Sequence, residues 1–576
     1  MKSHPLFRKS ILMLALALVF CTGVSAQEYV GPRTNSYNDP SDGIYVSPNG
    51  NDATATGAID APYKSINTAL AVANPGNTII LRNGVYHEYA SVRIRKPNIT
   101  IKSAKGEWAV IDLPLEHDPD VNWHQSSAIR FDVDGEGSSG GKLQSLEVTG
   151  GFYAVSLETK WDWGQPDNSG ASHITIEDCK LHDSRNDVVK VKPNCRNVTI
   201  CYNEIYNSGR EHIDKPNFPT GQENSGGIDN VNGANMHVHH NYIHDICSTG
   251  VYAKGGATDA VIEDNRIERT YAAGIMIGFD TSPEFFDLTV NPKYYENING
   301  TVRNNLIINT GWAGIGLYAS KDAQVYNNTV VDAVIYGAGN FNSPIFFGVA
   351  NQDWENPDGC PPNINPNIHH NLINQPSSYK NRMIDIRYVK DFYDPELFPD
   401  LPSYDLSALE GMPTMNNNCY YLAGGSARFT DNRPNSLLDN GGLDAWKTHI
   451  NGDNNSIETD PALNANYMPT NTQCTEMGIP YPLLINNWTG IDIPANLTSG
   501  IRVYPNPTTG ELHIGYEICD NRICDIEIYD IMGRSVRTYR IRPNDNETET
   551  TINVSHLPSG VYFIKIENKT VKFVKK

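Results

Sequence analysis

Seven short stretches decide the fold of this chain, because they share one pattern at near-constant spacing. They read EDCKLHD (177–183), CYNEIYN (201–207), HHNYIHD (239–245), EDNRIER (263–269), RNNLIIN (303–309), YNNTVVD (326–332) and HHNLINQ (369–375). Their third residues, which we call the anchors, are 24, 38, 24, 40, 23 and 43 residues apart. The spacing indicates a repeat of about 24 residues, with loops of about 14 to 20 residues inserted into alternate repeats.

Each repeat predicts three short strands, such as Tyr242-Ile243-His244 followed by Val251 to Lys254. No single repeat can bury its apolar face alone, so stacked repeats are expected to share one continuous core. Parallel crossovers of this kind are right-handed. The sequence therefore predicts an all-β, right-handed parallel β-helix. Its anchor Asn residues are expected to hydrogen-bond neighbouring turns as scaffold rather than to act in catalysis.

The N-terminal end of the coil carries a predicted cap. Ile66, Ala69, Leu70 and Ala73 recur at helical spacing, which favours an amphipathic helix that covers the open first turn. The stretches YVSPNGND (45–52) and 61–88 resemble the opening segment of many extracellular β-helix proteins, polysaccharide lyases among them.

The chain divides into four predicted parts. Residues 1–26 read as a cleavable export signal, 27–464 as the β-helix (irregular after about 340), 465–500 as a linker and 501–576 as a small β-sandwich. Within the last part, VYPNPTTGELHI (503–514) and IEIYDIMGRSV (526–536) closely resemble the sorting domain of the type IX secretion system. The resemblance implies transport by that machinery, a secreted or cell-surface location and removal of the tail. We expect no membrane span in the mature protein, and a monomer.

Charge and cysteine content exclude two classes of site. The chain has 66 acidic and 45 basic residues, a formal charge of -21, which argues against nucleic acid as a partner but leaves room for a local basic groove. The cysteines form no CxxC pairs, so no zinc site is expected, although Cys519 and Cys524 could bridge locally. His182 and His244 share one repeated position, which we interpret as packing at a turn rather than as a metal site.

The repeat register predicts which side chains point outward on one face. If Ile129, Val155, Val189, Ile228, Val251 and Ile275 point inward, the next residues form an outward column: Arg130, Ser156, Lys190, Asp229, Tyr252 and Met276. A second column follows two residues later: Asp132, Glu158, Lys192, Val231, Lys254 and Gly278. The turn at Asp229 is one residue short, so we expect a slip there, with Asn230 or Asn232 in the second column.

These columns gather basic side chains into a candidate groove for an anionic polysaccharide outside the cell. Adjacent turns lie about 4.8 Å apart, a regular ladder for a sugar chain. Elimination at a uronate needs a cation on the carboxylate, a base for the C5 proton and an acid for the leaving oxygen. Lys190 and Lys192 are candidates for the cation, Lys254 for a base whose pKa neighbouring lysines lower, and Tyr252 for the acid, beside Asp229. Candidate substrate-binding residues are Arg130, Glu158, Lys160, Asn232 and Asp280.

One further resemblance bears on a metal cofactor. The run from Cys179 to Ile205 resembles the catalytic turn of the chondroitinase B and alginate lyase family, in which two carboxylates hold calcium and a later lysine is the base. Here Lys190 and Lys192 stand at the calcium positions, and Asn194 or Cys195 near that of the base. We therefore predict no metal ligands, with lysine replacing the metal and calcium left open.

Other functions stay open. The exposed strand faces could carry these charges without any function. A glycoside hydrolase could use a pair among Asp132, Glu158, Asp229 and Asp280, and a uronate epimerase needs almost the same proton-abstracting groups as a lyase. A non-catalytic glycan-binding protein or adhesin could use the aromatic loops 161–170, 210–224 and 279–297. The favoured prediction is a polysaccharide lyase.

Overall fold

The computed structural model describes residues 27–114, 126–161, 169–209, 225–336, 343–351, 359, 361–375, 382–392, 404–486, 501–504, 508–516, 524–530, 535–541, 549–566 and 569–576. The predicted export signal, most of the loop 161–170, the whole loop 210–224 and residues 487–500 of the predicted linker lie outside these ranges.

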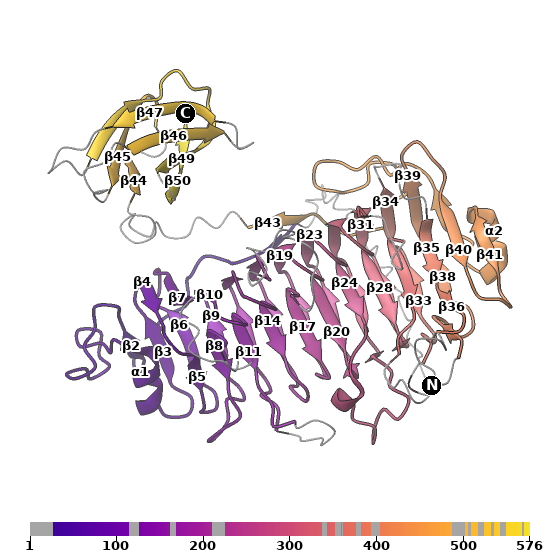
Figure 1. The fold of residues 1–576 in the computed structure, drawn as a ribbon, viewed down its shortest axis with the longest axis horizontal. Coiled ribbons are helices and arrows are strands. Elements are labelled where there is room, and N and C mark those ends of the chain that lie inside the picture. The colour runs from indigo at the N-terminus through magenta and orange to yellow at the C-terminus, as the bar shows by residue number, and fades with distance from the viewer. Residues whose placement is uncertain are drawn as a thin grey trace, which may run out of the picture.

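The strands form three twelve-stranded sheets that run along one elongated coil (Figure 1). The chain visits the three sheets in turn, and we number them in that order. Sheet 1 consists of β2 (Ile44–Val46), β3 (Thr78–Leu81), β6 (Thr100–Ser103), β9 (Lys142–Gln144), β12 (Thr175–Glu177), β15 (Thr199–Cys201), β18 (His237–His239), β22 (Val261–Glu263), β26 (Thr301–Arg303), β30 (Gln324–Tyr326), β33 (Asn367–His369) and β38 (Thr414–Asn416).

Sheet 2 follows each of these strands after a turn of two residues in the regular repeats. It consists of β4 (Gly84–His87), β7 (Ala109–Leu113), β10 (Glu147–Gly150), β13 (Lys180–His182), β16 (Glu204–Tyr206), β19 (Tyr242–Ile246), β23 (Arg266–Thr270), β27 (Leu306–Thr310), β31 (Thr329–Ala333), β34 (Leu372–Gln375), β39 (Cys419–Leu422) and β42 (Ile457–Glu458).

Sheet 3 completes each coil. It consists of β5 (Val92–Ile94), β8 (Ile129–Phe131), β11 (Val155–Leu157), β14 (Val189–Val191), β17 (Ile228–Val231), β20 (Val251–Lys254), β24 (Ile275–Ile277), β28 (Ile315–Tyr318), β32 (Ile345–Gly348), β35 (Arg382–Ile386), β40 (Arg428–Asp431) and β41 (Leu438–Gly441). Neighbouring strands pair in parallel, except for β41, which pairs antiparallel with β40. The predicted parallel β-helix is confirmed.

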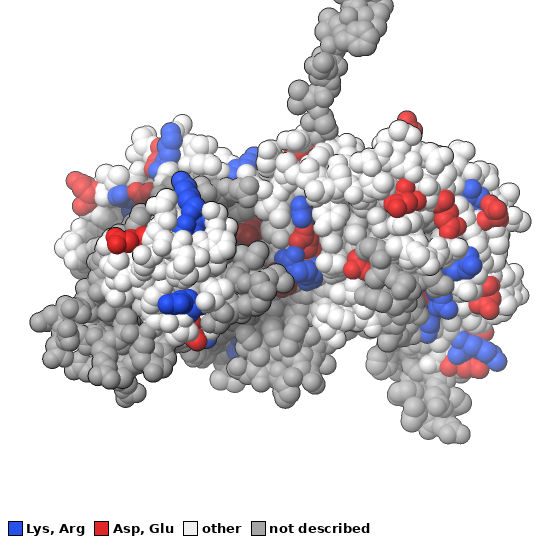
Figure 2. All heavy atoms as spheres, turned by 90° about the horizontal axis from the view of Figure 1, so that it is seen from above, with Lys and Arg blue, Asp and Glu red and all other residues white. Residues whose placement is uncertain are grey.

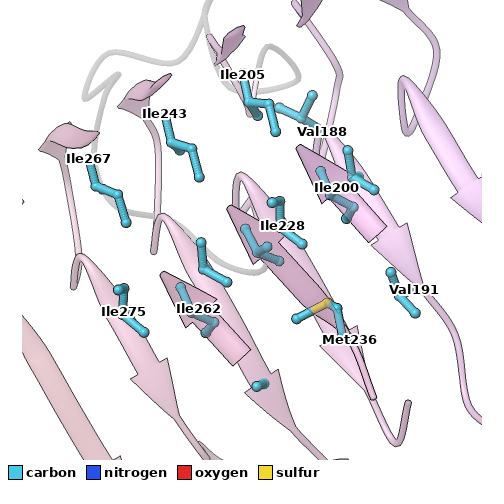
Figure 3. Packing of buried hydrophobic residues seen from close by; sticks show 14 of the residues in the cluster. Val188, Val191, Ile200, Ile205, Ile228, Met236, Ile243, Ile262, Ile267 and Ile275 are labelled. Atoms are coloured by element: carbon cyan, nitrogen blue, oxygen red, sulfur yellow. The ribbon is translucent and has the colours of Figure 1, made fainter. Parts of the chain in front are cut away.

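The core is one continuous apolar column inside the coil. Ile228 and Ile275 of sheet 3 face Ile243 and Ile267 of sheet 2, and Ile262 of sheet 1 closes the triangle (Figure 3). All five side chains are fully buried or nearly so. Burying an isoleucine stabilises a fold by about 2 kcal/mol, so the stability of the coil grows with each added turn.

The anchor asparagines form a second, polar column inside the coil. The side-chain amide of Asn241 donates to the side-chain oxygen of Asn265 at 3.0 Å, and Asn265 donates in the same way to Asn305 at 3.0 Å. Similar bonds link Asn203 to Asn241 and continue from Asn305 through Asn328 and Asn371 to Asn418. Every one of these side chains is fully buried. The side-chain amides of the anchors form the hydrogen bonds that buried polar groups need in the turns between sheets 1 and 2. The scaffold role predicted for the anchors is therefore confirmed.

Two helices cover the open ends of the coil. The predicted cap is α1 (Ile66–Val72), whose Ile66, Ala69 and Leu70 are buried against the first turn. At the other end, α2 (Leu443–Ile450) places Trp446 on Phe429 of β40, with ring centroids 5.2 Å apart. The sequence reading did not find α2.

The segment 465–486, which we call the strap, packs along the outside of sheet 2. Ile479 and Leu483 pack with Leu306 and Val331, and β43 (Leu483–Ile485) pairs in parallel with β1 (Glu28–Val30). The predicted linker therefore does not begin at residue 465. Its apolar residues are spaced for contact with sheet 2 rather than for a helix or a strand, so they were not recognised from sequence.

Residues 501–576 form the predicted small β-sandwich. One sheet contains β44 (Ile501–Tyr504), β45 (Glu511–Tyr516) and β48 (Glu549–Asn553), and the other β46 (Cys524–Asp530), β47 (Ser535–Ile541), β49 (Gly560–Ile566) and β50 (Lys569–Lys575). Leu512, Ile528 and Phe573 belong to a core that contains no β-helix residue among those described.

Among the described residues, no helix is long and apolar enough to cross a membrane. On the face seen in Figure 2, basic side chains lie beside acidic ones.

Candidate functional site

The predicted register of sheet 3 is confirmed for the first column. Backbone pairing places Arg130 beside Ser156, Ser156 beside Lys190 and Lys190 beside Asp229. Asp229 is in turn paired with Tyr252, and Tyr252 with Met276.

The predicted slip at Asp229 is wrong. Val231 pairs directly with Lys254, because β17 continues as a regular strand through Val231. Asn230 consequently points into the coil, where its side-chain oxygen accepts a hydrogen bond from the Gly233 amide at 3.0 Å. Asn232 lies past the strand and donates to the Phe285 carbonyl at 2.5 Å, so it fixes the loop 279–296 to the coil.

The centre of the site is a buried group of four charges. Lys190 forms ion pairs with Asp229 and, at 3.3 Å, with Asp187, while Lys254 lies 3.7 Å from Asp229. Asp187 also accepts a hydrogen bond from the Gly226 amide at 2.6 Å. Sequence reasoning missed Asp187, although its spacing of three residues before Lys190 is a usable signal.

The pKa values of the two carboxyl groups of this centre are shifted in opposite directions. Burial raises the pKa of Asp187, and the nearby charge of Asp229 adds to that rise. Burial acts on Asp229 too, but Lys190 and Lys254 outweigh it and hold its pKa below the ordinary value. The pKa of Lys190 is raised, because Asp229 and Asp187 overcome the effect of burial. A pair of acids with separated pKa values is a common arrangement in proton-transfer sites.

A second group of charges extends the centre towards the first turns. Glu158 contacts Lys192 at 2.7 Å and Arg130 at 3.4 Å, and it accepts a hydrogen bond from Ser156 at 2.7 Å. Asp132 likewise forms ion pairs with Arg95, at 3.2 Å, and with Arg93. We call the ion-paired residues of both groups the sheet 3 network: Arg93, Arg95, Arg130, Asp132, Asp134, Glu158, Asp187, Lys190, Lys192, Asp229 and Lys254.

Tyr252 and Lys254 are not the exposed groups that the sequence predicts. Tyr252 is 3% exposed and packs with Met276, Tyr318 and the ring of Phe279 in an apolar cluster on the outer face of sheet 3. Its hydroxyl lies 3.2 Å from that of Ser248, and burial raises its pKa. Lys254 is 5% exposed, with its ammonium 4.5 Å from the Tyr252 ring centre. The sequence predicts that neighbouring lysines repel the charge of Lys254. In the structure Lys254 instead forms an ion pair with Asp229.

The remaining predicted residues lie at the edges of this face. Lys192 is the most accessible lysine of the network, with 22% of its side chain exposed, compared with 15% for Lys190. Lys160 and Asp280 are exposed and follow the ends of β11 and β24.

The network does not fit a calcium ion. Lys190 places its ammonium against both central carboxylates, where a cation would otherwise lie. Among the described residues, no group of three or more His, Cys, Asp or Glu side chains is arranged to hold a metal.

A cavity of about 410 Å³ lies at the corner after sheet 2. Tyr271 and Tyr336 line one wall with their ring centres 4.8 Å apart, and Asp245 and Arg269 form an ion pair at 2.8 Å on the lining. The sequence reading missed this cavity, although four of its lining residues stand at the seventh position of the repeated stretches: Asn207, Asp245, Arg269 and Asn309.

Two families match parts of this chain. Residues 167–345 match the family described as a right-handed beta helix region, and residues 502–576 match the secretion system C-terminal sorting domain. Pectate lyase PEL9 of Emericella nidulans is 40% identical over 74 residues, which cover 12% of this chain and 18% of that enzyme. This chain therefore spans less than a fifth of that curated relative.

Several solved structures are also similar. Pectate lyase Pel9A is 16% identical, with 60% of this chain and 80% of that chain covered and a TM-score of 0.38. The A-module of the Azotobacter vinelandii mannuronan C-5 epimerase AlgE4 is 12% identical over 60% and 86% of the two chains, with a TM-score of 0.38. A PL6 alginate lyase in complex with a trisaccharide is 13% identical over 69% and 81%, with a TM-score of 0.36.

The stacked sheets contain the residues of the β-helix match, and the sorting-domain match lies after them in the chain. The protein is a right-handed parallel β-helix with a type IX secretion sorting domain at its C-terminus, and it is secreted or displayed at the cell surface.

Proposed function

We propose that this protein is a polysaccharide lyase that cleaves a uronic-acid-containing polymer by β-elimination. The observation that carries the proposal is the charge of the sheet 3 network, which contains six basic and five acidic side chains on a protein of net charge -21. Basic side chains on consecutive turns suit a polymer with one carboxylate per repeating sugar. The similarity of one stretch to an enzyme named a pectate lyase also supports this chemistry.

In this proposal the accessible cations bind the uronate. Lys192 and Arg130 share Glu158, so a substrate carboxylate can take over part of their pairing without leaving a buried charge unpaired. Neutralising the carboxylate makes the C5 proton more acidic and stabilises the charge that develops as the proton leaves.

The proton-transfer step is assigned to the buried centre. Lys254 is the proposed base, because its amine nitrogen lies 3.7 Å from Asp229. Tyr252 is the proposed acid, because its ring centre lies 4.5 Å from that nitrogen. Asp229 has one carboxylate oxygen that is buried and without a hydrogen-bond donor among the described residues. Glu158, Lys160, Asn232 and Asp280 stay proposed substrate contacts.

The direct test is an assay on polygalacturonate, alginate and glycosaminoglycans that follows the ultraviolet absorbance of unsaturated uronates. The proposal expects absorbance on at least one polymer. It also expects an unchanged rate in the presence of a chelator, because Lys190 occupies the place of a metal. Reducing ends without absorbance would indicate a hydrolase, and deuterium exchange at C5 without cleavage would indicate an epimerase.

A matched pair of variants tests the assigned face. Lys192→Ala is expected to lower kcat/KM by about 10²-fold, the size typical of losing one charged contact to the transition state. Lys180→Ala is the control, since Lys180 on sheet 2 has 24% of its side chain exposed and pairs with Glu204 at 3.1 Å. Equal activity of the two variants would move the site away from sheet 3.

Non-catalytic glycan binding is the second candidate, favoured by the corner cavity. Two tyrosine rings on the wall, of which that of Tyr336 is exposed, can stack on a sugar. The Asp245–Arg269 pair leaves the cavity with little net charge. This candidate expects oligosaccharide binding that Tyr271→Ala weakens, together with no product on any polymer.

A further inference from the structure

Two buried cysteines meet where the strap crosses the C-terminal turns of the coil. Cys419 is the first residue of β39, directly after the anchor Asn418, and Cys474 lies in the strap. Their sulfur atoms are 3.5 Å apart, and both residues are fully buried. Four other cysteines of the described chain are also buried: Cys179, Cys195, Cys201 and Cys247.

Apolar side chains surround this pair on one side, and the Cys419 thiol donates to the Thr459 carbonyl at 3.6 Å. Leu372 of sheet 2 and Met477 of the strap complete the cluster around the two sulfur atoms. A disulfide has an S–S distance of about 2.04 Å, so closing the pair requires an approach of about 1.5 Å, within reach of small side-chain rotations. Neither sulfur has to cross a backbone segment to reach the other.

We propose that Cys419 and Cys474 form a disulfide bond in the exported protein, and that this bond fastens the strap to sheet 2. The sorting domain sends the chain out of the cytoplasm, into compartments where disulfides form and persist. The bond joins residues 55 positions apart and fixes the strap near its middle, whereas β43 fixes it near its end.

The chemistry is a thiol–disulfide exchange with an oxidised protein dithiol as the oxidant. Two S–H bonds break and one S–S bond forms between Cys419 and Cys474. The oxidant's disulfide is reduced to two thiols, which receive the two electrons and the two protons.

Burial determines when this exchange can occur. It raises the pKa of both thiols, and for Cys419 the neighbouring Cys474 raises it further, so the docked pair holds very little of the reactive thiolate. The bond therefore forms before or while the strap docks, and afterwards the same burial shields it from reductants. The proposal is independent of any catalytic activity on sheet 3.

Peptide mapping of the full-length exported protein gives the first test. The protein is denatured without reductant, alkylated, digested and analysed by mass spectrometry. We expect the peptides that contain Cys419 and Cys474 to be joined and two hydrogens lighter than their sum, while Cys195 is alkylated. Alkylation of both Cys419 and Cys474, or a bond from either to another cysteine, would overturn the proposal.

A comparison with and without reductant gives the second test and does not depend on the stability of any variant. Because the folded protein shields the bond, it is reduced in denaturant and the protein is refolded with reductant present. This treatment is expected to lower the thermal midpoint of the wild-type protein and to speed proteolysis of the strap. It is expected to change neither property in the double variant Cys419→Ala/Cys474→Ala. An equal effect of reductant on both proteins would overturn the proposal, and so would no effect on the wild type.

Discussion

At the scale of single residues, the asparagine column shows how one side chain can serve two turns. The side chain of Asn265 accepts hydrogen bonds from the backbone and side-chain amides of Asn241 and donates to three oxygens, including that of Asn305. An alanine at this position leaves buried partners on both sides unsatisfied, and each costs about 1–3 kcal/mol.

We therefore expect Asn265→Ala to destabilise the β-helix by about 3 kcal/mol or more in denaturant unfolding. Asn367→Ala is the control, because Asn367 is half-buried and its side chain donates to Gln324 at 2.9 Å on the surface of sheet 1. A loss of equal size in both variants would contradict the scaffold role of the column.

His182 links the stability of the protein to pH. Burial alone would lower its pKa, but bonds to Asp183 at 2.7 Å and Glu147 at 3.2 Å raise it from 6.5 to about 9. A pKa that is higher in the folded state adds stability that is full below pH 6.5 and is lost as the pH rises through about 9. The shift corresponds to about 3 kcal/mol at most.

The quantity to compare is the free energy of unfolding of the wild type minus that of His182→Gln. We expect this difference to be about 3 kcal/mol larger at pH 6 than at pH 10. Denaturant titrations at the two pH values measure this difference. His87→Gln, at an exposed histidine of the same sheet, controls for general effects of losing an imidazole. A difference that does not change with pH would show that His182 is not protonated in the folded protein.

At the scale of elements, α2 closes the coil as α1 does at the other end. Trp446 is fully buried against Phe429, so without its ring the last turn exposes part of its core. Trp446→Ala is expected to cost about 3–5 kcal/mol. Hydrogen exchange should quicken in β40 and remain slow in β20. Leu437→Ala, at a residue 66% exposed near the same end, should change neither quantity.

The coil itself could be predicted from sequence because its rules are periodic. Val189, Ile228 and Val251 recur at one position in each repeat, and their alternation with Lys190, Asp229 and Tyr252 gives the correct outward column. Contacts outside the coil follow no period. Tyr252 is buried by Phe279 and Tyr318 from later turns, and the strap docks through residues with no repeat of their own.

For the same reason, the sequence identified the basic residues of the candidate site but not their partners. Lys190 and Lys192 were found by alternation along one strand, whereas their pairing with Asp187, Asp229 and Glu158 depends on side-chain reach between turns. The α2 cap was missed, although Leu443, Trp446 and Ile450 recur at helical spacing and are buried.

At the scale of the whole molecule, the β-helix and the sorting domain have separate cores. The core of residues 501–576 contains Leu512, Ile526 and Phe573 but no described residue of the coil. A chain that stops after Asn486 is therefore expected to keep the thermal midpoint of the β-helix and any activity of sheet 3, and to lose export. Calorimetry of both chains measures this, and a lowered β-helix midpoint in the shorter chain would contradict the separation.

The pairing of β1 with β43 brings residues 28–30 beside residues 483–485. The first and last strands of this part of the chain therefore lie side by side. A short peptide joining these two strands would make the polypeptide chain circular. The chain could then be opened at another exposed turn. Such circular permutants should keep the three sheets and the sheet 3 network. They would also allow a different element of the coil to leave the cell first, and so separate the order of export from the order of folding.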